Sequence, residues 1–251
     1  MHLELLIPEW NELPANVGAL CTLRSGGISV PPYGDGDGNG GLNLGSHVGD
    51  DPCHVERNRQ CLSRILPGSP VWLSQVHGTR VVNVAEVSGI AEADACISTQ
   101  PGMVCAIMTA DCLPVLLCDV AGKVVGAAHA GWRGLVDGVL ENTVGAMRDA
   151  GADRITAWLG PAIGPQAFDV GTEVREAFVQ KQAAAAAAFV KGDTEGKYFA
   201  DIYALARLRL QTLKVDQVEG GGFCTVTDSK RFYSYRRDRV TGRMATLIWL
   251  K

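Results

Sequence analysis

The chain has 251 residues, of which 47% are hydrophobic and 20% charged, a balance that excludes a disordered or fibrous protein. Its formal net charge of −4 leaves no surplus of basic side chains to neutralise a run of phosphates, so we expect no nucleic-acid polymer as a partner. No segment approaches the roughly 18 uninterrupted apolar residues of a membrane span, and no basic start precedes an apolar stretch, so we expect a cytoplasmic protein without a membrane partner.

Short apolar runs between turn residues predict strands along most of the chain. In chain order these strands are Leu20–Leu23, Val71–Leu73, Val81–Val84, Val104–Met108, Val115–Cys118, Lys123–His129, Thr156–Leu159, Phe232–Tyr235 and Met244–Leu250. Apolar residues at helical spacing predict helices over Val55–Ile65, Leu135–Ala150, Thr172–Ala188 and Asp201–Leu213. The elements predict a mixed α and β fold, and the length fits a single domain over residues 1–251.

Eight cysteines could form four disulfides, but a chain of this length without an export signal favours reduced thiols. Five of them have apolar or small neighbours and are expected to fill the core, because free cysteine behaves as a small hydrophobe. These are Cys21, Cys96, Cys105, Cys118 and Cys224.

Three local sequences place a metal ligand at the end of an apolar run. They are Ser74–Gly78, Thr109–Pro114 and Ala128–Gly134. A side chain at a strand end is held by the rigid strand and yet remains open to a ligand. His77, Cys112 and His129 are therefore candidate metal ligands.

Two imidazoles and one thiolate match the three-ligand arrangement of catalytic zinc, in which a fourth position stays open. A structural zinc site would normally take four protein ligands. The wide separation of the three residues along the chain leaves an alternative open, namely two hydrogen-bonded histidines and one buried thiol.

Motifs along nearly the whole chain resemble the laccase-domain family, which includes multicopper polyphenol oxidase-like proteins, peptidoglycan editing factors and purine nucleoside phosphorylases. The matching motifs are Thr22–Ser29, Asn43–Gly45, Asn58–Arg59, Gln75–Gly78, Ala93–Ala95, Thr109–Pro114, His129–Gly134, Leu159–Gly164, Phe232–Arg237 and Thr241–Met244. The main departure is a longer loop between Pro31 and Gly41, which affects local loop contacts. The resemblance implies an α+β fold with mixed β-sheets in a sandwich-like core flanked by helices, similar to deamidating toxins that use a Cys–His pair.

The resemblance also implies a metal and an activity. His77, Cys112 and His129 would be zinc ligands, with Cu²⁺ as the other metal to consider. The reaction would be phosphorolysis of adenosine, inosine and methylthioadenosine to the free base and a ribose 1-phosphate, with adenosine deamination beside it. The partners would be purine nucleosides and phosphate, bound by a monomer or a small homo-oligomer.

Further candidate side chains lie in the matching motifs. Those expected to bind substrate or phosphate are Arg24, Asn43, Arg133 and Arg236. An arginine binds phosphate bidentately, although each of these could instead form a structural ion pair. Deamination needs activated water and a carboxyl group that carries protons. Asp111 and Asp94 are candidates for that catalytic role, beside Cys112 and His129, although both could be turn or cap residues.

Aromatic residues could provide a face on which a purine stacks, although most aromatics in such positions belong to the core. The candidates are Tyr198, Phe199, Phe223, Phe232, Tyr233 and Tyr235.

Other functions remain open from the sequence. Cys112 and His129 could be the nucleophile and base of a hydrolase that edits peptidoglycan precursors, with His77 orienting them and no metal needed. A copper-dependent polyphenol oxidase would place copper at the same ligands, but four-electron reduction of oxygen needs several copper ions. A non-enzymatic partner protein would use the metal only to hold its fold.

Overall fold

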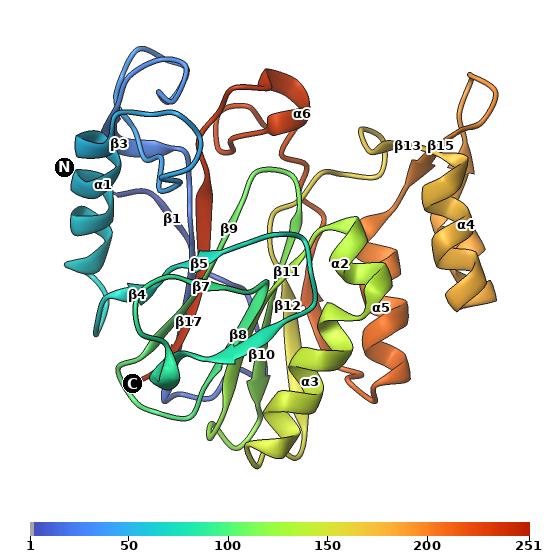
Figure 1. Cartoon of the computed structure of the whole chain (residues 1–251), viewed down its shortest axis with the longest axis horizontal. Coiled ribbons are helices and arrows are strands. Elements are labelled where there is room, and N and C mark those ends of the chain that lie inside the picture. Colours follow the sequence, from blue (N-terminus) through green and yellow to red (C-terminus); the bar gives the residue numbers. More distant parts are fainter. Residues whose placement is uncertain (1–2) are drawn as a thin grey trace.

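Two mixed β-sheets packed face to face form the centre of the computed structural model, which describes residues 3–251 (Figure 1). The first sheet has the order β1–β2–β17–β9–β4, with bounds Leu5–Leu6, Val17–Thr22, Met244–Leu250, Val104–Thr109 and Pro70–Val71. The second has the order β16–β12–β10–β11–β8–β6, with bounds Val218–Gly220, Ile155–Leu159, Leu113–Asp119, Val125–Ala130, Ala95–Ser98 and Val81–Asn83. The strands around the centre of each sheet pair antiparallel.

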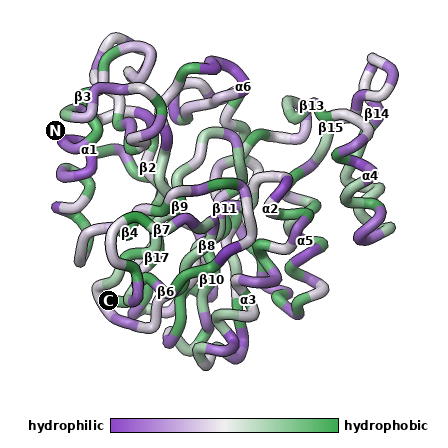
Figure 2. The backbone as a smooth tube through the Cα atoms, in the orientation of Figure 1, coloured by the Kyte–Doolittle hydropathy of each residue, from purple (hydrophilic) through white to green (hydrophobic). Residues whose placement is uncertain are grey.

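The central strands read as continuous apolar runs because both of their faces are buried. In β10, Leu116 and Cys118 face the core between the sheets, whereas Val115 and Leu117 face the opposite side. Alternate side chains of a strand point to opposite faces, so one strand contributes to two cores. Figure 2 shows the hydrophobic residues concentrated in these central strands.

Helices cover the outer face of each sheet (Figure 1). α1 (Pro52–Ser63) lies against the first sheet, where its Leu62 packs with Leu20 and Leu247. α2 (Trp132–Asp137), α3 (Val139–Asp149) and α5 (Ile202–Thr212) pack their apolar residues against the second sheet. The structure confirms the predicted sandwich-like core flanked by helices.

Smaller elements surround this core. β13 (Asp169–Gly171), β15 (Lys197–Ala200) and β14 (Phe189–Lys191) form a three-stranded sheet that projects at the right of Figure 1 beside α4 (Thr172–Lys181) and η2 (Ala183–Ala188). β5 (Leu73–Ser74) pairs with β7 (Ala91–Glu92). The remaining elements are β3 (Ser25–Ser29), η1 (Val84–Glu86) and α6 (Tyr235–Asp238).

Two predicted helices are each divided in the structure. The helix expected over Leu135–Ala150 breaks at Gly138, whose φ of 107° places it in the left-handed region, where glycine avoids a steric clash. The helix expected over Thr172–Ala188 ends at Lys181, because Gln182 adopts extended angles before the 3₁₀ helix of the alanine run. Helical propensity did not show either break.

The predicted strand Phe232–Tyr235 is wrong. Phe232 and Tyr233 are fully buried, but they lie in an irregular segment, and Tyr235 begins α6. Ser234 caps that helix by accepting a hydrogen bond from the backbone N–H of Arg237 (3.2 Å). The aromatic run reflects burial in a loop, where its backbone pairs with no strand in the described residues.

The remaining predictions on the fold agree more closely with the structure. Met244–Leu250 and the helix near Asp201–Leu213 are confirmed, whereas Val71–Leu73 is divided between β4 and β5. All eight cysteines are free, and Cys21, Cys96, Cys105 and Cys118 are buried, whereas Cys224 is half-buried. In residues 3–251 we find no helix with the length and apolarity required to cross a membrane.

Candidate metal centre and its cavity

His129 lies near the end of β11, a strand held between β10 and β8. Its backbone N–H donates to the carbonyl of Asp94 (2.7 Å), and its side chain is buried. The imidazole Nδ1 lies 2.8 Å from Oδ1 of Asp94. Because a carboxylate only accepts hydrogen bonds, Nδ1 carries the proton and Nε2 is left free to bind a ligand.

His77 lies in the loop that follows β5. Its φ of 62° is left-handed, which is uncommon for a residue other than glycine. The backbone N–H groups of Val76, His77 and Gly78 all donate to the carboxylate of Asp94, at 3.1, 2.9 and 2.7 Å. This one carboxylate therefore fixes the loop that carries His77.

Asp94 connects both histidines through four hydrogen bonds, although it is fully buried. Burial by itself would raise the pKa of this carboxyl, but the hydrogen bond from His129 and those from the backbone amides outweigh burial and lower it. A charged acceptor that orients a ligating histidine is a recurrent support of metal sites. These contacts hold the loop of His77 and the imidazole of His129 in place.

Cys112 lies in the turn between β9 and β10 and is half-buried. The preceding residue, Asp111, has a left-handed φ of 93°. Pro114, the second residue of β10, lies opposite His129. That register places the turn with Cys112 beside the end of β11.

The structure brings the three candidate ligands together. One ligand atom from each of His77, Cys112 and His129 lies within 4.8 Å of the others, and Cys112 Sγ lies 3.7 Å from His77 Nε2. Gly131 leaves room for the cluster, since a Cβ at that position would lie 2.9 Å from the His77 ring and 3.1 Å from Cys112 Sγ. Two imidazole nitrogens and one sulfur suit zinc or copper.

The electrostatics of the cluster favour an ion pair between Cys112 and His129. Burial opposes ionisation of the thiol, but the charge of His129 and hydrogen bonds from both histidines lower the pKa of Cys112 to about 6. Burial also disfavours the charged imidazole, but the Cys112 thiolate and Asp94 raise the pKa of His129 to about 9. A metal ion would therefore meet a thiolate already formed and an imidazolium that must lose its proton.

Zinc affinity is expected to increase with pH between about 6 and about 9. In this window binding releases one proton from His129, so the association constant should rise about tenfold per pH unit. Competition with a chromophoric chelator, corrected for the chelator's own protonation, measures the slope. An affinity that does not change across the window would contradict the ion pair.

The cluster of His77, Cys112 and His129 opens into a cavity of about 560 Å³, a size typical of sites for small molecules. Its basic lining consists of His47, Arg133, Arg236 and Arg243. Within residues 3–251 none of these four forms an ion pair with a carboxylate. Trp132, Phe168 and Tyr235 supply aromatic surface to the same cavity.

Missed from the sequence were two of the basic lining residues, Arg243 and His47, and the aromatic lining residues Trp132 and Phe168. Arg243 belongs to the matching motif Thr241–Met244, and its place just before a buried strand was the available signal. Burial lowers the pKa of Arg243, opposed by the nearby Cys112 and Asp111. Burial, together with the charges of Arg243 and Arg59, lowers the pKa of His47, which favours a neutral imidazole. No local pattern distinguished His47.

Arg24 and Asn43 do not lie at this cavity. The Arg24 guanidinium donates to the carbonyls of Ser229 (2.7 Å) and Gly34 (2.8 Å), so it joins two loops. The Asn43 amide is fully buried, where its oxygen accepts the backbone N–H of Arg243 (2.9 Å). Both contacts support segments around the cavity, and neither side chain is among those that line it.

Asp111 lines the cavity, but both of its carboxylate oxygens are engaged. Oδ1 accepts from the Thr225 hydroxyl (2.5 Å), and Oδ2 accepts from the backbone N–H of Arg236 (2.6 Å). Of the six aromatic residues considered from the sequence, Tyr235 alone is among the lining residues. Its side chain is 49% exposed, which is consistent with a place at the mouth.

The chain is similar to known proteins over nearly its whole length. The model of the family described as multi-copper polyphenol oxidoreductase laccase matches residues 18–251. A protein named purine nucleoside phosphorylase YfiH from Escherichia coli is 54% identical over 251 residues, which cover 98% of this chain and 99% of the relative. A purine nucleoside phosphorylase from Pseudomonas aeruginosa is 54% identical over 246 residues and covers 98% of both chains.

Solved structures show the same fold. A Neisseria meningitidis protein superposes with a TM-score of 0.90 at 49% identity and covers 98% of this chain and 99% of its own. A Bacillus licheniformis hypothetical protein, also called YfiH, superposes with a TM-score of 0.85 at 30% identity, covering 98% and 96%.

Proposed function

The chain belongs to the multi-copper polyphenol oxidoreductase laccase family, and on that basis we propose that it is a zinc-dependent purine nucleoside phosphorylase. The observation that carries the proposal is the His77–Cys112–His129 cluster opening into a cavity lined by aromatic rings and by three arginines that form no ion pair within residues 3–251. The proposed substrates are adenosine, inosine and methylthioadenosine, with phosphate as the second substrate. Adenosine deamination is proposed as a side activity of the same centre.

His77, Cys112 and His129 would hold the metal, and a zinc ion there would supply a Lewis acid. We propose zinc rather than copper, because four-electron reduction of oxygen needs several copper ions and the described residues supply one such group of three ligands. Metal analysis of the purified protein tests this choice.

The basic lining supplies what phosphate requires. In phosphorolysis a phosphate oxygen forms a bond to C1′ of the sugar, the bond from C1′ to the purine nitrogen breaks, and the electron pair leaves with the base. Arg133, Arg236 and Arg243 can hold the phosphate dianion through charged hydrogen bonds. Because none of the three forms an ion pair with a carboxylate within the described residues, they remain able to bind an anion.

The aromatic lining suits a purine ring. Tyr235, which is 49% exposed, offers an aromatic face on which a base can stack, and the mostly buried Phe168 lines the same cavity. The guanidinium of Arg236 lies 5.8 Å from the centre of the Phe168 ring, so the phosphate and base regions adjoin. We place the base against these rings and the phosphate at the arginines.

Replacing Arg236 with alanine is expected to raise the KM for phosphate roughly 10- to 100-fold, the effect of losing a hydrogen bond to a charged group. The variant keeps the backbone N–H that bonds Asp111. Steady-state kinetics with inosine and varied phosphate measure the change. Arg175→Ala is the matched control, because Arg175 lies on α4 and does not line the cavity. An unchanged KM would exclude Arg236 from the phosphate site.

Chromatographic product analysis of the zinc-loaded protein with adenosine, with and without phosphate, tests the proposed function. Phosphate-dependent release of adenine supports phosphorolysis, and inosine formed without phosphate supports the side activity. Deamination has weaker support, because the carboxylates of both Asp94 and Asp111 are already engaged by hydrogen-bond donors. If neither adenine nor inosine forms, the proposal is contradicted.

A second candidate function is a Cys–His hydrolase, favoured by the chain of contacts from Asp94 through His129 to Cys112. An oriented imidazole beside a thiolate is the arrangement of a cysteine nucleophile. Alkylation of Cys112 with and without a chelator separates the two candidates. A thiol that reacts as fast in the metal-loaded protein as in the chelated protein would favour the hydrolase.

A further inference from the structure

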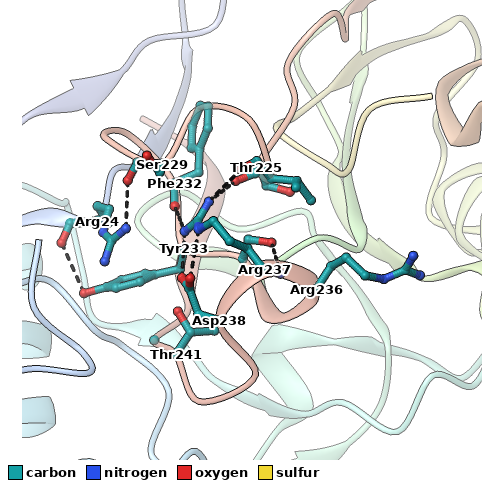
Figure 3. Close-up of polar contacts among 12 residues, drawn as sticks. Arg24, Thr225, Ser229, Phe232, Tyr233, Arg236, Arg237, Asp238 and Thr241 are labelled. Atoms are coloured by element: carbon teal, nitrogen blue, oxygen red, sulfur yellow. Dashed lines mark hydrogen bonds and ion pairs between the residues drawn. The ribbon is translucent and has the colours of Figure 1, made fainter. Parts of the chain in front are cut away.

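The segment Thr225–Asp238 is a braced loop that ends in α6. Arg237 donates through Nη1 to the carbonyl of Thr225 (2.7 Å) and through Nη2 to that of Phe232 (3.1 Å). Arg24 binds the carbonyl of Ser229 from outside the loop. Figure 3 shows Arg237 turned into the loop while the neighbouring Arg236 points away from it. The segment is therefore a preformed unit that presents Arg236 outward.

One carboxylate fixes both ends of this unit. Asp111 accepts a hydrogen bond from the hydroxyl of Thr225 at the start of the segment and another from the backbone N–H of Arg236 in α6. Thr225 is fully buried, and Asp111 is 9% exposed. Asp111 also precedes Cys112 directly, so the residue to which the segment is attached is the chain neighbour of a candidate metal ligand.

We propose that Asp111 is a positioning residue whose carboxylate sets Arg236 and Tyr235 of the segment at a fixed place relative to the metal ligands. The identity of the substrates that Arg236 and Tyr235 would contact rests on the proposed function. The attachment of the segment through the Asp111 carboxylate does not. The left-handed backbone of Asp111 supports the assignment, because a strained conformation persists only where surrounding contacts hold it. Substrate positioning of this kind affects affinity for phosphate more than affinity for metal.

The proposal distinguishes positioning from proton transfer by Asp111. In Asp111→Asn the amide oxygen can accept from the Arg236 N–H, while the amide nitrogen donates to the Thr225 oxygen, which has free lone pairs. Asparagine also tolerates the left-handed conformation. The variant therefore keeps both contacts but cannot carry a proton as a carboxyl does. Asp111→Ala loses both contacts.

The experiment compares the zinc-loaded wild type with Asp111→Asn, Asp111→Ala and Thr225→Val. Limited trypsin digestion reports the attachment independently of activity, because Lys230, Arg231 and Arg239 are exposed within or beside the segment. Zinc content and the KM and kcat for phosphorolysis complete the readouts. Thr225→Val removes one of the two contacts and serves if the alanine variant does not fold.

We expect Asp111→Asn to keep trypsin resistance, zinc content and kcat within about threefold of wild type, because the amide replaces each hydrogen bond of the carboxylate with another. Asp111→Ala should be cleaved faster and raise the phosphate KM more than about tenfold, with zinc retained and kcat changed less. A large loss of kcat in Asp111→Asn with resistance intact would overturn positioning in favour of proton transfer. Unchanged cleavage of both Asp111→Ala and Thr225→Val would overturn the attachment. If the wild type showed no phosphorolysis, the proposed function would fail, while digestion would still decide the attachment.

Discussion

Replacing Cys112 with alanine is expected to remove the metal and to lower phosphorolysis by more than about 100-fold, because loss of a mere supporting partner already costs 10- to 100-fold in affinity or activity. Cys112 is half-buried in a turn and belongs to none of the apolar clusters. The change in the free energy of unfolding should therefore be small compared with the 5–15 kcal/mol typical of a domain. Metal content by mass spectrometry and thermal unfolding by circular dichroism measure both effects.

Cys53→Ala is the control for this experiment, because Cys53 is an exposed thiol on α1. It should retain metal, turnover and thermal stability. If Cys112→Ala unfolded, the metal would serve the fold, and the protein would fit a zinc-stabilised partner without enzymatic activity. If the variant kept both metal and turnover, the cluster would not be the reaction centre.

Replacing Asp94 with asparagine is expected to weaken zinc binding by about 10- to 100-fold. The amide offers one accepting oxygen where the carboxylate accepts four donors, so at least one buried N–H loses its partner. An unsatisfied buried donor costs about 1–3 kcal/mol of the free energy of unfolding. Chelator competition and urea denaturation measure the two quantities.

The stability effect of Asp94 should depend on pH. Despite burial, which opposes ionisation, the hydrogen bond from His129 and the backbone amides hold the pKa of Asp94 below its ordinary value of 3.8. A lowered folded pKa contributes stability above the unfolded value, and that contribution is lost as the pH falls through the folded pKa. The wild type should lose its advantage over Asp94→Asn below about pH 4.

Asp119→Asn is the matched control, because Asp119 is a buried aspartate that also accepts backbone amides, from Lys123 and Asp153. It should lower stability without changing zinc affinity. Equal losses of zinc affinity in the two variants would show that Asp94 acts only through general stability.

Local patterns predicted the elements that are long, apolar and buried on both faces. The strand Met244–Leu250 appears with its predicted bounds, since a continuous apolar run in this position has to lie between two cores. The same pattern misassigned Phe232–Tyr235, because buried aromatic residues in a braced loop have the composition of a strand. Periodicity likewise extended a helix through Gly138, where the backbone reverses its hand.

The sequence by itself determined the family through motifs along the chain, and the sandwich-like fold and the three metal ligands entered as what that resemblance implies; local patterns alone indicated a mixed α and β fold. Only the tertiary structure decided which polar groups meet. Asp94 became the support of two histidines, and Asp111 joined a segment 125 positions away, because the packing of two sheets brings separate turns to one edge. The same packing places the Arg24 side chain in a contact between loops and the Arg243 side chain in the lining of the cavity. The direction of a side chain depends on the register and packing of its element, which residue type alone does not specify.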